Sequence, residues 1–289
     1  MSDARPIGLF DSGVGGLTVL QSVRSRLPRE STVYLGDGGR APYGPRSDEE
    51  VIRFSGECLD HLATHDVKAI VVACNTSSAV ALAWLRRRTE VPILGVVRPG
   101  AMAAAVATRT GRVGVIATEA TVRSGAYPAA IADERPGTLV RAHATPALVP
   151  LVEAGTLEGP LVDEVVRESL APVLAVSAEP AIDTLLLGCT HYPLLGPAIA
   201  RVAGDGIAVI DSAHATASAL AVVLEVDGAF APADHEPEHR LLTTGDVDAF
   251  ERTARILFGG PVGHVERIRL DLDRATVTAG VQGTGGATR

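Results

Sequence analysis

Lysine is almost absent from this chain. The sequence holds 26 basic residues, and Lys68 is the only lysine among them, so the remaining basic residues are arginines. An enzyme that uses pyridoxal phosphate needs a lysine to form the Schiff base, and a phosphate-binding P-loop needs one after its glycines. Lys68 directly precedes an apolar run and so begins a strand, whereas active sites of α/β proteins lie where strands end. The sequence therefore excludes both cofactor classes.

Cysteines, long apolar runs and basic clusters are also scarce. Three cysteines without a C-x-x-C spacing suggest neither a disulfide framework nor a zinc site. No apolar run is long enough to span a bilayer, and the opening residues MSDARPIGLF lack the features of a secretory signal. The net charge is −8, and the largest basic run, Arg86-Arg87-Arg88, fits the solvent face of a helix. We therefore expect a cytoplasmic protein that binds neither nucleic acid nor membrane.

The chain does contain a regular alternation of short apolar runs and helical patterns. This alternation predicts the α/β class, with βα units around mainly parallel sheets, and 289 residues are enough for two lobes. The expected strands are 7–10, 32–35, 69–73, 93–97, 112–117, 139–142, 184–187 and 207–210.

One helix start is marked clearly. Ser47 with Glu50 three residues later predicts a capping box. Apolar residues then recur on one helical face at positions 51, 54, 58 and 62, which makes Cys58 a core thiol rather than a reactive one.

Two segments of the chain recur in its second half. IGLFDSGVGG (7–16) resembles RVGVIATEAT (112–121), and AIVVACNTSSA (69–79) resembles TLLLGCTHYPL (184–194). Their order and spacing are similar in both halves. We therefore expect two pseudo-symmetric α/β lobes whose corresponding strand ends meet at an interdomain cleft.

The division into lobes follows from this repeat. We expect a first lobe of residues 1–97 and 212–270, and a second lobe of residues 98–211, with a hinge at 92–99. Residues 271–289 are rich in Gly and Thr without periodicity, which predicts a disordered tail.

Four segments carry reactive side chains to the expected carboxyl ends of strands, where α/β proteins bind ligands. They are Asp11-Ser12-Gly13, Pro42-Tyr43-Gly44, Cys74-Asn75-Thr76 and Cys189-Thr190-His191. Each cysteine lies between an expected strand and the N-terminus of the next helix. The positive end of that helix favours the thiolate, so we expect the thiol pKa to be lowered toward neutrality.

A pair of such thiols fits a reaction that removes a proton from one face of a carbon and returns one to the other face. Racemisation needs an acid and a base on opposite sides of the substrate, and they exchange roles in the reverse reaction. A single cysteine could instead act as a nucleophile with a neighbouring histidine as base. That alternative explains Cys189 with His191 and leaves Cys74 without a role. The residues favour a cofactor-independent amino-acid racemase.

Seven blocks of the chain resemble signature blocks of the glutamate racemases, in the aspartate/glutamate racemase superfamily. They are FDSGVGGLTV (10–19), APYG (41–44), ACNTSSA (73–79), ATEATVRSGAY (117–127), LVPLVEAG (148–155), LLLGCTHYPLL (185–195) and TTGD (243–246). The combination of GCTHYPLL with FDSGVGG is very specific. One block departs from the pattern: Gly38-Gly39 stand where family members often carry a hydroxyl residue and a small one.

The resemblance implies a two-lobe fold that interconverts L- and D-glutamate by 1,1-proton transfer, without cofactor or metal, to supply D-glutamate for peptidoglycan. It implies that Cys74 and Cys189 are the catalytic acid/base pair. The residues that it assigns to substrate binding are Asp11, Ser12, Tyr43, Gly44, Asn75, Thr76, Thr190 and His191. We also expect a homodimer.

Several of these residues have a second interpretation. Asp11 can pair with the α-ammonium group or cap a helix, and His191 can polarise the Cys189 thiol or be a buried structural histidine. Glu153 is either a carboxylate behind the site or a surface residue, and Thr121 either contacts substrate or is structural. Residues 13–16, Gly-Val-Gly-Gly, match neither phosphate-binding motif and fit tight packing of strand against helix.

Other functions stay open at this point. Aspartate and hydantoin racemases share the cysteine pair, although FDSGVGG and GCTHYPLL favour glutamate. A phosphatase could use Asp11 as nucleophile, but it commonly needs a second carboxylate two residues on, where this chain has Gly13. Some glutamate racemases bind DNA gyrase, a non-enzymatic alternative for which the sequence shows no contact.

We expect the purified protein to racemise glutamate without added metal and without a visible chromophore. The physical reason is that no lysine and no metal-ligand cluster is available at the strand ends. An absorbance spectrum and an activity assay after treatment with a chelator check this. A band typical of bound pyridoxal phosphate, or complete loss of activity with the chelator, would contradict it.

Overall fold

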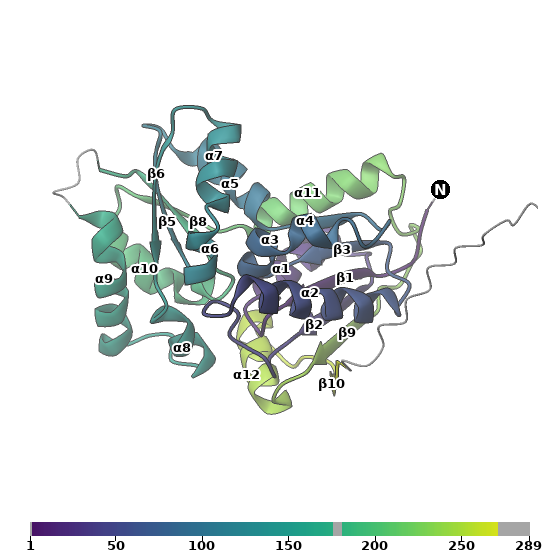
Figure 1. Ribbon diagram of the computed structural model, residues 1–289. Helices are drawn as coiled ribbons and strands as arrows, with labels where there is room; N and C mark the ends of the chain where they lie inside the picture. Colours follow the sequence, from purple (N-terminus) through teal and green to yellow (C-terminus); the bar gives the residue numbers. More distant parts are fainter. Residues whose placement is uncertain (1, 176–180, 271–289) are drawn as a thin grey trace, which may run out of the picture.

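The structure is a computed structural model that describes residues 2–175 and 181–270. Its strands form two sheets (Figure 1). The strands are β1 (Ile7–Asp11), β2 (Thr32–Gly36), β3 (Ala69–Val72), β4 (Ile93–Gly95), β5 (Arg112–Ala117), β6 (Leu139–Ala144), β7 (Thr184–Gly188), β8 (Ala208–Ile210), β9 (His239–Thr243) and β10 (Val265–Arg267). The sheet orders are β10-β9-β2-β1-β3-β4 and β6-β5-β7-β8. Every pair of these strands is parallel, which confirms the α/β class.

Helices pack on both faces of each sheet and bury its apolar side chains. They are α1 (Leu17–Arg26), α2 (Asp48–Ala63), α3 (Asn75–Val80), α4 (Leu82–Leu85), α5 (Val97–Ala107), α6 (Glu119–Arg123), α7 (Ala126–Glu134), α8 (Leu148–Glu153), α9 (Pro160–Leu174), α10 (Gly196–Ala203), α11 (Ala213–Val226), α12 (Val247–Phe258) and the 3-10 helix η1 (Tyr192–Leu195). None of the helices in the described ranges is both long and apolar enough to cross a membrane.

The eight strands expected from the sequence are all present, and their ends differ from the expected ones by at most two residues. The sequence analysis does not predict β9 and β10. Only the last three residues of β9 are buried, and β10 has three residues of which one is buried. Neither segment therefore shows the apolar run by which the other strands were recognised.

The two sheets repeat one strand order, β2-β1-β3-β4 in the first and β6-β5-β7-β8 in the second. Ala69 begins β3 and Thr184 begins β7, and Cys74 and Cys189 each follow five residues later. The cysteines therefore leave equivalent strands of the two sheets. The lobe boundaries at 97/98 and 211/212 stay predictions, and the tail predicted as disordered, 271–289, lies outside the described residues.

The capping box at the start of α2 is confirmed. The Glu50 N–H donates to Ser47 Oγ at 3.3 Å, and the Ser47 N–H donates to Glu50 Oε2 at 3.2 Å. Cys58 is fully buried in the core between α2 and the first sheet, together with Leu59 and Leu62. This confirms that Cys58 is a core thiol.

The single lysine joins three segments of the chain. Lys68 Nζ donates to the carbonyl oxygens of Asp3 at 2.6 Å and Ala229 at 2.8 Å, and it lies 2.5 Å from Glu30 Oε2. The other carboxylate oxygen of Glu30 accepts from the Ala231 N–H at 2.8 Å. Both charged side chains are almost fully buried. The pair therefore fixes the N-terminal residues and the segment after α11 to the beginning of β3.

We expect Lys68→Met to lower the free energy of unfolding by about 3–5 kcal/mol, because it leaves the Glu30 carboxylate buried without its counter-charge. The double variant Lys68→Met/Glu30→Gln removes both charges and should recover part of this loss. Urea unfolding followed by the fluorescence of Trp84, the single tryptophan, measures both. A Lys68→Met variant as stable as the wild type would show that the ion pair is not structural.

Candidate active site

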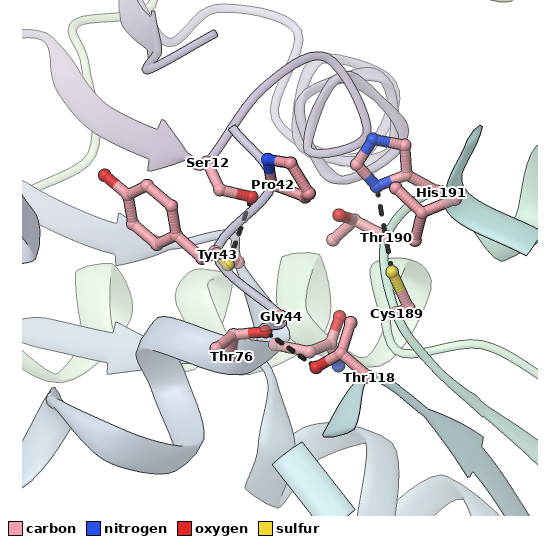
Figure 2. Close-up of a pocket in the computed structure, with 12 residues that line it drawn as sticks. Ser12, Pro42, Tyr43, Gly44, Thr76, Thr118, Cys189, Thr190 and His191 are labelled. Atoms are coloured by element: carbon pink, nitrogen blue, oxygen red, sulfur yellow. Dashed lines mark hydrogen bonds between the residues drawn. The ribbon is translucent and has the colours of Figure 1, made fainter. Parts of the chain in front are cut away.

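One pocket is lined by residues that follow strands of both sheets (Figure 2). Ser12 and Cys74 follow β1 and β3 of the first sheet, and Thr118 and Cys189 follow β5 and β7 of the second. The lining residues are Ser12, Pro42, Tyr43, Gly44, Cys74, Asn75, Thr76, Thr118, Val149, Cys189, Thr190 and His191. The four segments that the sequence analysis singled out therefore meet at this pocket.

Cys74 is a buried thiol at the start of α3. The Ser77 N–H donates to its Sγ at 3.5 Å, and the thiol donates to Ser12 Oγ at 3.6 Å. Burial and the negative charge of Asp11 raise the pKa of Cys74 to about 12, and these two hydrogen bonds offset only part of the rise. The expectation of a lowered thiol pKa is therefore wrong for Cys74. Loss of hydration outweighs the N–H groups of a six-residue helix.

Cys189 has an imidazole as its nearest polar partner. Its Sγ lies 3.7 Å from Nδ1 of His191. Figure 2 marks this contact with a dashed line. The helical segment after Cys189 starts later than its counterpart after Cys74. The 3-10 helix η1 begins at Tyr192, and α10 begins only at Gly196.

His191 lies between Cys189 and a carboxylate. Its Nε2 is 3.0 Å from Glu153 Oε1. Burial favours the neutral ring, but the contacts with Cys189 and Glu153 and the charge of Asp11 outweigh burial and raise the pKa of His191 well above its usual value. The same contact lowers the pKa of Glu153. These contacts therefore favour the protonated form of the His191 ring, which lies directly beside the Cys189 sulfur. Glu153 does not line the pocket and contacts it through His191.

Asp11 is completely buried and lies behind the pocket rather than in its lining. Its Oδ2 accepts from the N–H groups of Gly13 at 3.2 Å and Gly16 at 2.9 Å, so it holds the turn before α1. Thr190 Oγ1 donates to Oδ1 at 3.4 Å. Gly15 permits this approach, since a Cβ there would lie 2.6 Å from Thr190 Oγ1. The pairing of Asp11 with an α-ammonium group stays a prediction.

Three threonine hydroxyls meet at the opposite side of the pocket. Thr76 Oγ1 and Thr118 Oγ1 are 2.9 Å apart, and Figure 2 marks this contact with a dashed line. Thr118 Oγ1 is also 2.9 Å from Thr121 Oγ1. Thr121 therefore supports the site from behind Thr118 and does not line it. Thr118 was not among the site residues expected from the sequence. The internal repeat could have found it, because Thr118 follows β5 at the position where Ser12 follows β1.

Tyr43 is held by a buried carboxylate. Its hydroxyl donates to Asp37, which also accepts from Arg40 Nε at 2.7 Å and from Thr244 Oγ1 at 2.6 Å. Gly39, in the block that departs from the family pattern, donates its N–H to Thr244 Oγ1 at 2.9 Å. A Cβ at residue 39 would lie 2.8 Å from the Thr244 carbonyl oxygen. Gly39 thus packs directly on the TTGD segment, which contacts the loop that carries Tyr43.

The arrangement is suited to proton transfer. Two thiols from equivalent strands line one pocket, one with an imidazolium beside it and the other buried in its neutral form. Hydroxyl and amide groups from both sheets surround them. Within residues 2–175 and 181–270, no group of three or more His, Cys, Asp or Glu side chains is placed to hold a metal ion.

Known proteins share this fold and sequence. The model of the Asp/Glu/Hydantoin racemase family matches residues 17–220, so the chain belongs to that family. A glutamate racemase of Bacillus cereus is 42% identical over 267 residues, which cover 92% of this chain and 98% of the relative. Within the family the chain therefore belongs to the glutamate racemases, as its motifs predicted.

Solved structures agree with this assignment. The glutamate racemase isoform RacE1 of Bacillus anthracis matches with a TM-score of 0.87 and 41% identity, over 92% of this chain and 97% of that one. The glutamate racemase of Francisella tularensis, solved in complex with D-glutamate, matches with a TM-score of 0.84 and 32% identity, over 93% and 99% of the two chains. The expected α/β fold with mainly parallel sheets is thereby confirmed.

We expect Glu153→Gln to lower the pKa of His191, because the variant removes a carboxylate that stabilises the imidazolium. His191 then loses its proton at a lower pH, and the basic limb of the kcat/KM profile moves to lower pH. Titration of the histidine ring protons by NMR, together with pH-rate profiles, measures this shift.

The exposed Glu158 supplies a matched control for this variant, since it belongs to the segment that follows α8 and no hydrogen bond joins it to His191. Glu158→Gln should leave the His191 titration unchanged. A titration that is the same in wild type and Glu153→Gln would show that Glu153 does not act on His191.

Proposed function

We propose that this chain interconverts L- and D-glutamate by moving the α-proton between Cys74 and Cys189 in the pocket between its two lobes. The observation that carries the proposal is that two buried thiols, each leaving the equivalent strand of its sheet, line a single pocket. The reaction would supply D-glutamate for peptidoglycan synthesis in the cytoplasm. The D-glutamate bound to the Francisella tularensis relative supports the choice of substrate.

The polar groups of the pocket match the charges of glutamate. Asn75 Oδ1 is buried and has no hydrogen-bond partner among the described residues, so it is a free acceptor for the α-ammonium group. The hydroxyls of Ser12 and Thr76 are donors for carboxylates, and the imidazolium of His191 adds a positive charge. In the proposal these groups hold the Cα of glutamate between the two sulfurs.

The two thiols have different polar neighbours. Burial keeps Cys74 protonated at neutral pH, and the imidazolium 3.7 Å from Cys189 stabilises negative charge on that sulfur. The Cys189 thiolate removes the α-proton of L-glutamate and leaves its electron pair on a planar carbanion. The Cys74 thiol then gives its proton to the opposite face and becomes the thiolate, which yields D-glutamate.

In the reverse direction Cys74 must act as the base. The negative charge of Asp11 raises the pKa of Cys74, and a bound α-ammonium group beside Asp11 would offset that charge. Binding of either enantiomer would therefore lower the pKa of Cys74 and make its thiolate more accessible.

The alternatives have less support. Use of Asp11 as a phosphatase nucleophile conflicts with its complete burial and with its hydrogen bonds to Gly13 and Gly16. A lone nucleophilic Cys189 leaves the buried Cys74 in the same pocket unexplained. A homodimer and a contact with DNA gyrase stay predictions.

We expect Cys74→Ala and Cys189→Ala each to abolish racemisation while exchanging the α-proton of one enantiomer only. The reason is geometric, since a thiolate on one face of Cα reaches only the proton that points toward it. In D₂O, Cys189→Ala should exchange the proton of D-glutamate with retained configuration, and Cys74→Ala that of L-glutamate. Proton NMR of each pure enantiomer over several hours is the readout.

Two further variants control this experiment. The double variant Cys74→Ala/Cys189→Ala is the blank. Cys58→Ala removes a buried thiol outside the pocket, so it should keep racemase activity and lose about 1 kcal/mol of stability. If both single variants exchange the same enantiomer, the arrangement of two opposed bases is wrong. If the preferences are reversed, only the assignment of each thiol to an enantiomer is wrong.

A further inference from the structure

Tyr127 links the second sheet to the residue that follows Cys74. It lies in the first turn of α7 and is 1% exposed. Its hydroxyl oxygen accepts from Asn75 Nδ2 at 2.5 Å. Asn75 lines the pocket, whereas Tyr127 does not. The tyrosine therefore acts on the site through Asn75.

Two glycines hold the Tyr127 ring in place. A Cβ at Gly188 would lie 2.9 Å from Tyr127 Cε2, and a Cβ at Gly100 would lie 3.5 Å from both Cε1 and the hydroxyl oxygen. Gly188 directly precedes Cys189 at the end of β7. The ring thus packs on the backbone that carries one catalytic thiol, and its hydroxyl contacts the side chain next to the other.

This contact determines the orientation of the Asn75 amide group. An amide has donors on its nitrogen and an acceptor on its oxygen, so a partner for the nitrogen leaves the oxygen turned to the other side. In the described residues Asn75 Oδ1 is buried without a partner. Burial of an acceptor without a hydrogen-bond partner costs free energy, and a cation that binds in the pocket and donates to this oxygen removes that cost. The substrate group of that charge is the α-ammonium.

We propose that Tyr127 is a positioning residue, which orients the Asn75 amide so that Oδ1 accepts a hydrogen bond from the α-ammonium group of glutamate. This inference rests on the proposed function and adds the residue that orients the Asn75 amide toward the amine. Without the Tyr127 hydroxyl the amide turns freely, and its NH₂ group can face the ammonium. The ammonium is held equally in the bound substrate and in the transition state, so the effect falls on KM and not on kcat.

The test compares Tyr127→Phe with Tyr192→Phe. Tyr192 is a matched control, because its hydroxyl is also fully buried and hydrogen-bonded, in this case to Thr145 of its own lobe, and it does not line the pocket. Tyr127→Phe should raise the KM for both enantiomers roughly fivefold to tenfold, as expected for the loss of one hydrogen bond to a charged group, with kcat unchanged. Tyr192→Phe should change neither constant.

A ligand that lacks the amine separates positioning from a general loosening of the site. Glutarate has both carboxylates of glutamate and no ammonium group. Calorimetric titration should show that Tyr127→Phe weakens D-glutamate binding by the same factor as it raises KM, and leaves glutarate binding unchanged. In an Asn75→Ala background, Tyr127→Phe should have no further effect on D-glutamate binding.

If Tyr127→Phe weakens the binding of D-glutamate and glutarate equally, Tyr127 only supports the fold of the site. If the binding of neither ligand changes, Tyr127 has no role in binding. Either result overturns the inference, as would an effect of Tyr127→Phe that persists in Asn75→Ala. A wild-type protein that binds D-glutamate without racemising it would contradict the proposed reaction alone. The binding comparison still decides the role of Tyr127 in that case.

Discussion

Parallel pairing of the strands is the constraint on which the rest of the structure depends. Every strand runs in the same direction as its neighbours, so the carboxyl ends of all strands in a sheet lie along one edge of that sheet. The strand interiors can then be almost entirely apolar and buried under helices. Polar chemistry is restricted to the few residues after each strand, and Ser12, Cys74, Thr118 and Cys189 are four of them.

The two halves of the chain repeat one strand arrangement, but the polar neighbours of their cysteines differ. The residue two positions after Cys74 is Thr76, and the residue two positions after Cys189 is His191. Thr76 adds no charge, and Cys74 has hydroxyl and amide neighbours in a buried site. His191 instead places a ring with a raised pKa beside the thiol of Cys189. Equivalent strands thus set the positions of the two sulfurs, and the residue two positions after each cysteine gives the two sulfurs different neighbours.

The sequence predicts the parts of this molecule whose signals are local. The apolar runs of β1 to β8, the capping box at Ser47 and the motif residues of the pocket are all of this kind. Strands β9 and β10 could not be predicted, because pairing with neighbouring strands rather than their own apolar residues defines them. The high pKa of Cys74 depends on burial by distant segments, and the contact of Tyr127 with Asn75 joins residues 52 positions apart. No local sequence pattern predicts the raised pKa or this contact.

The buried lysine has a consequence for the surface of the protein. Its ammonium group is buried, donates to the carbonyls of Asp3 and Ala229 and forms an ion pair with the carboxylate of Glu30. The side chains that give the surface its positive charge are therefore arginines, which keep their protons far above neutral pH. The four tyrosines are buried as well. Titration through the alkaline range in which ordinary proteins lose lysine protons should leave the charge of this surface nearly constant, and reagents that acylate amines meet no free side chain on it.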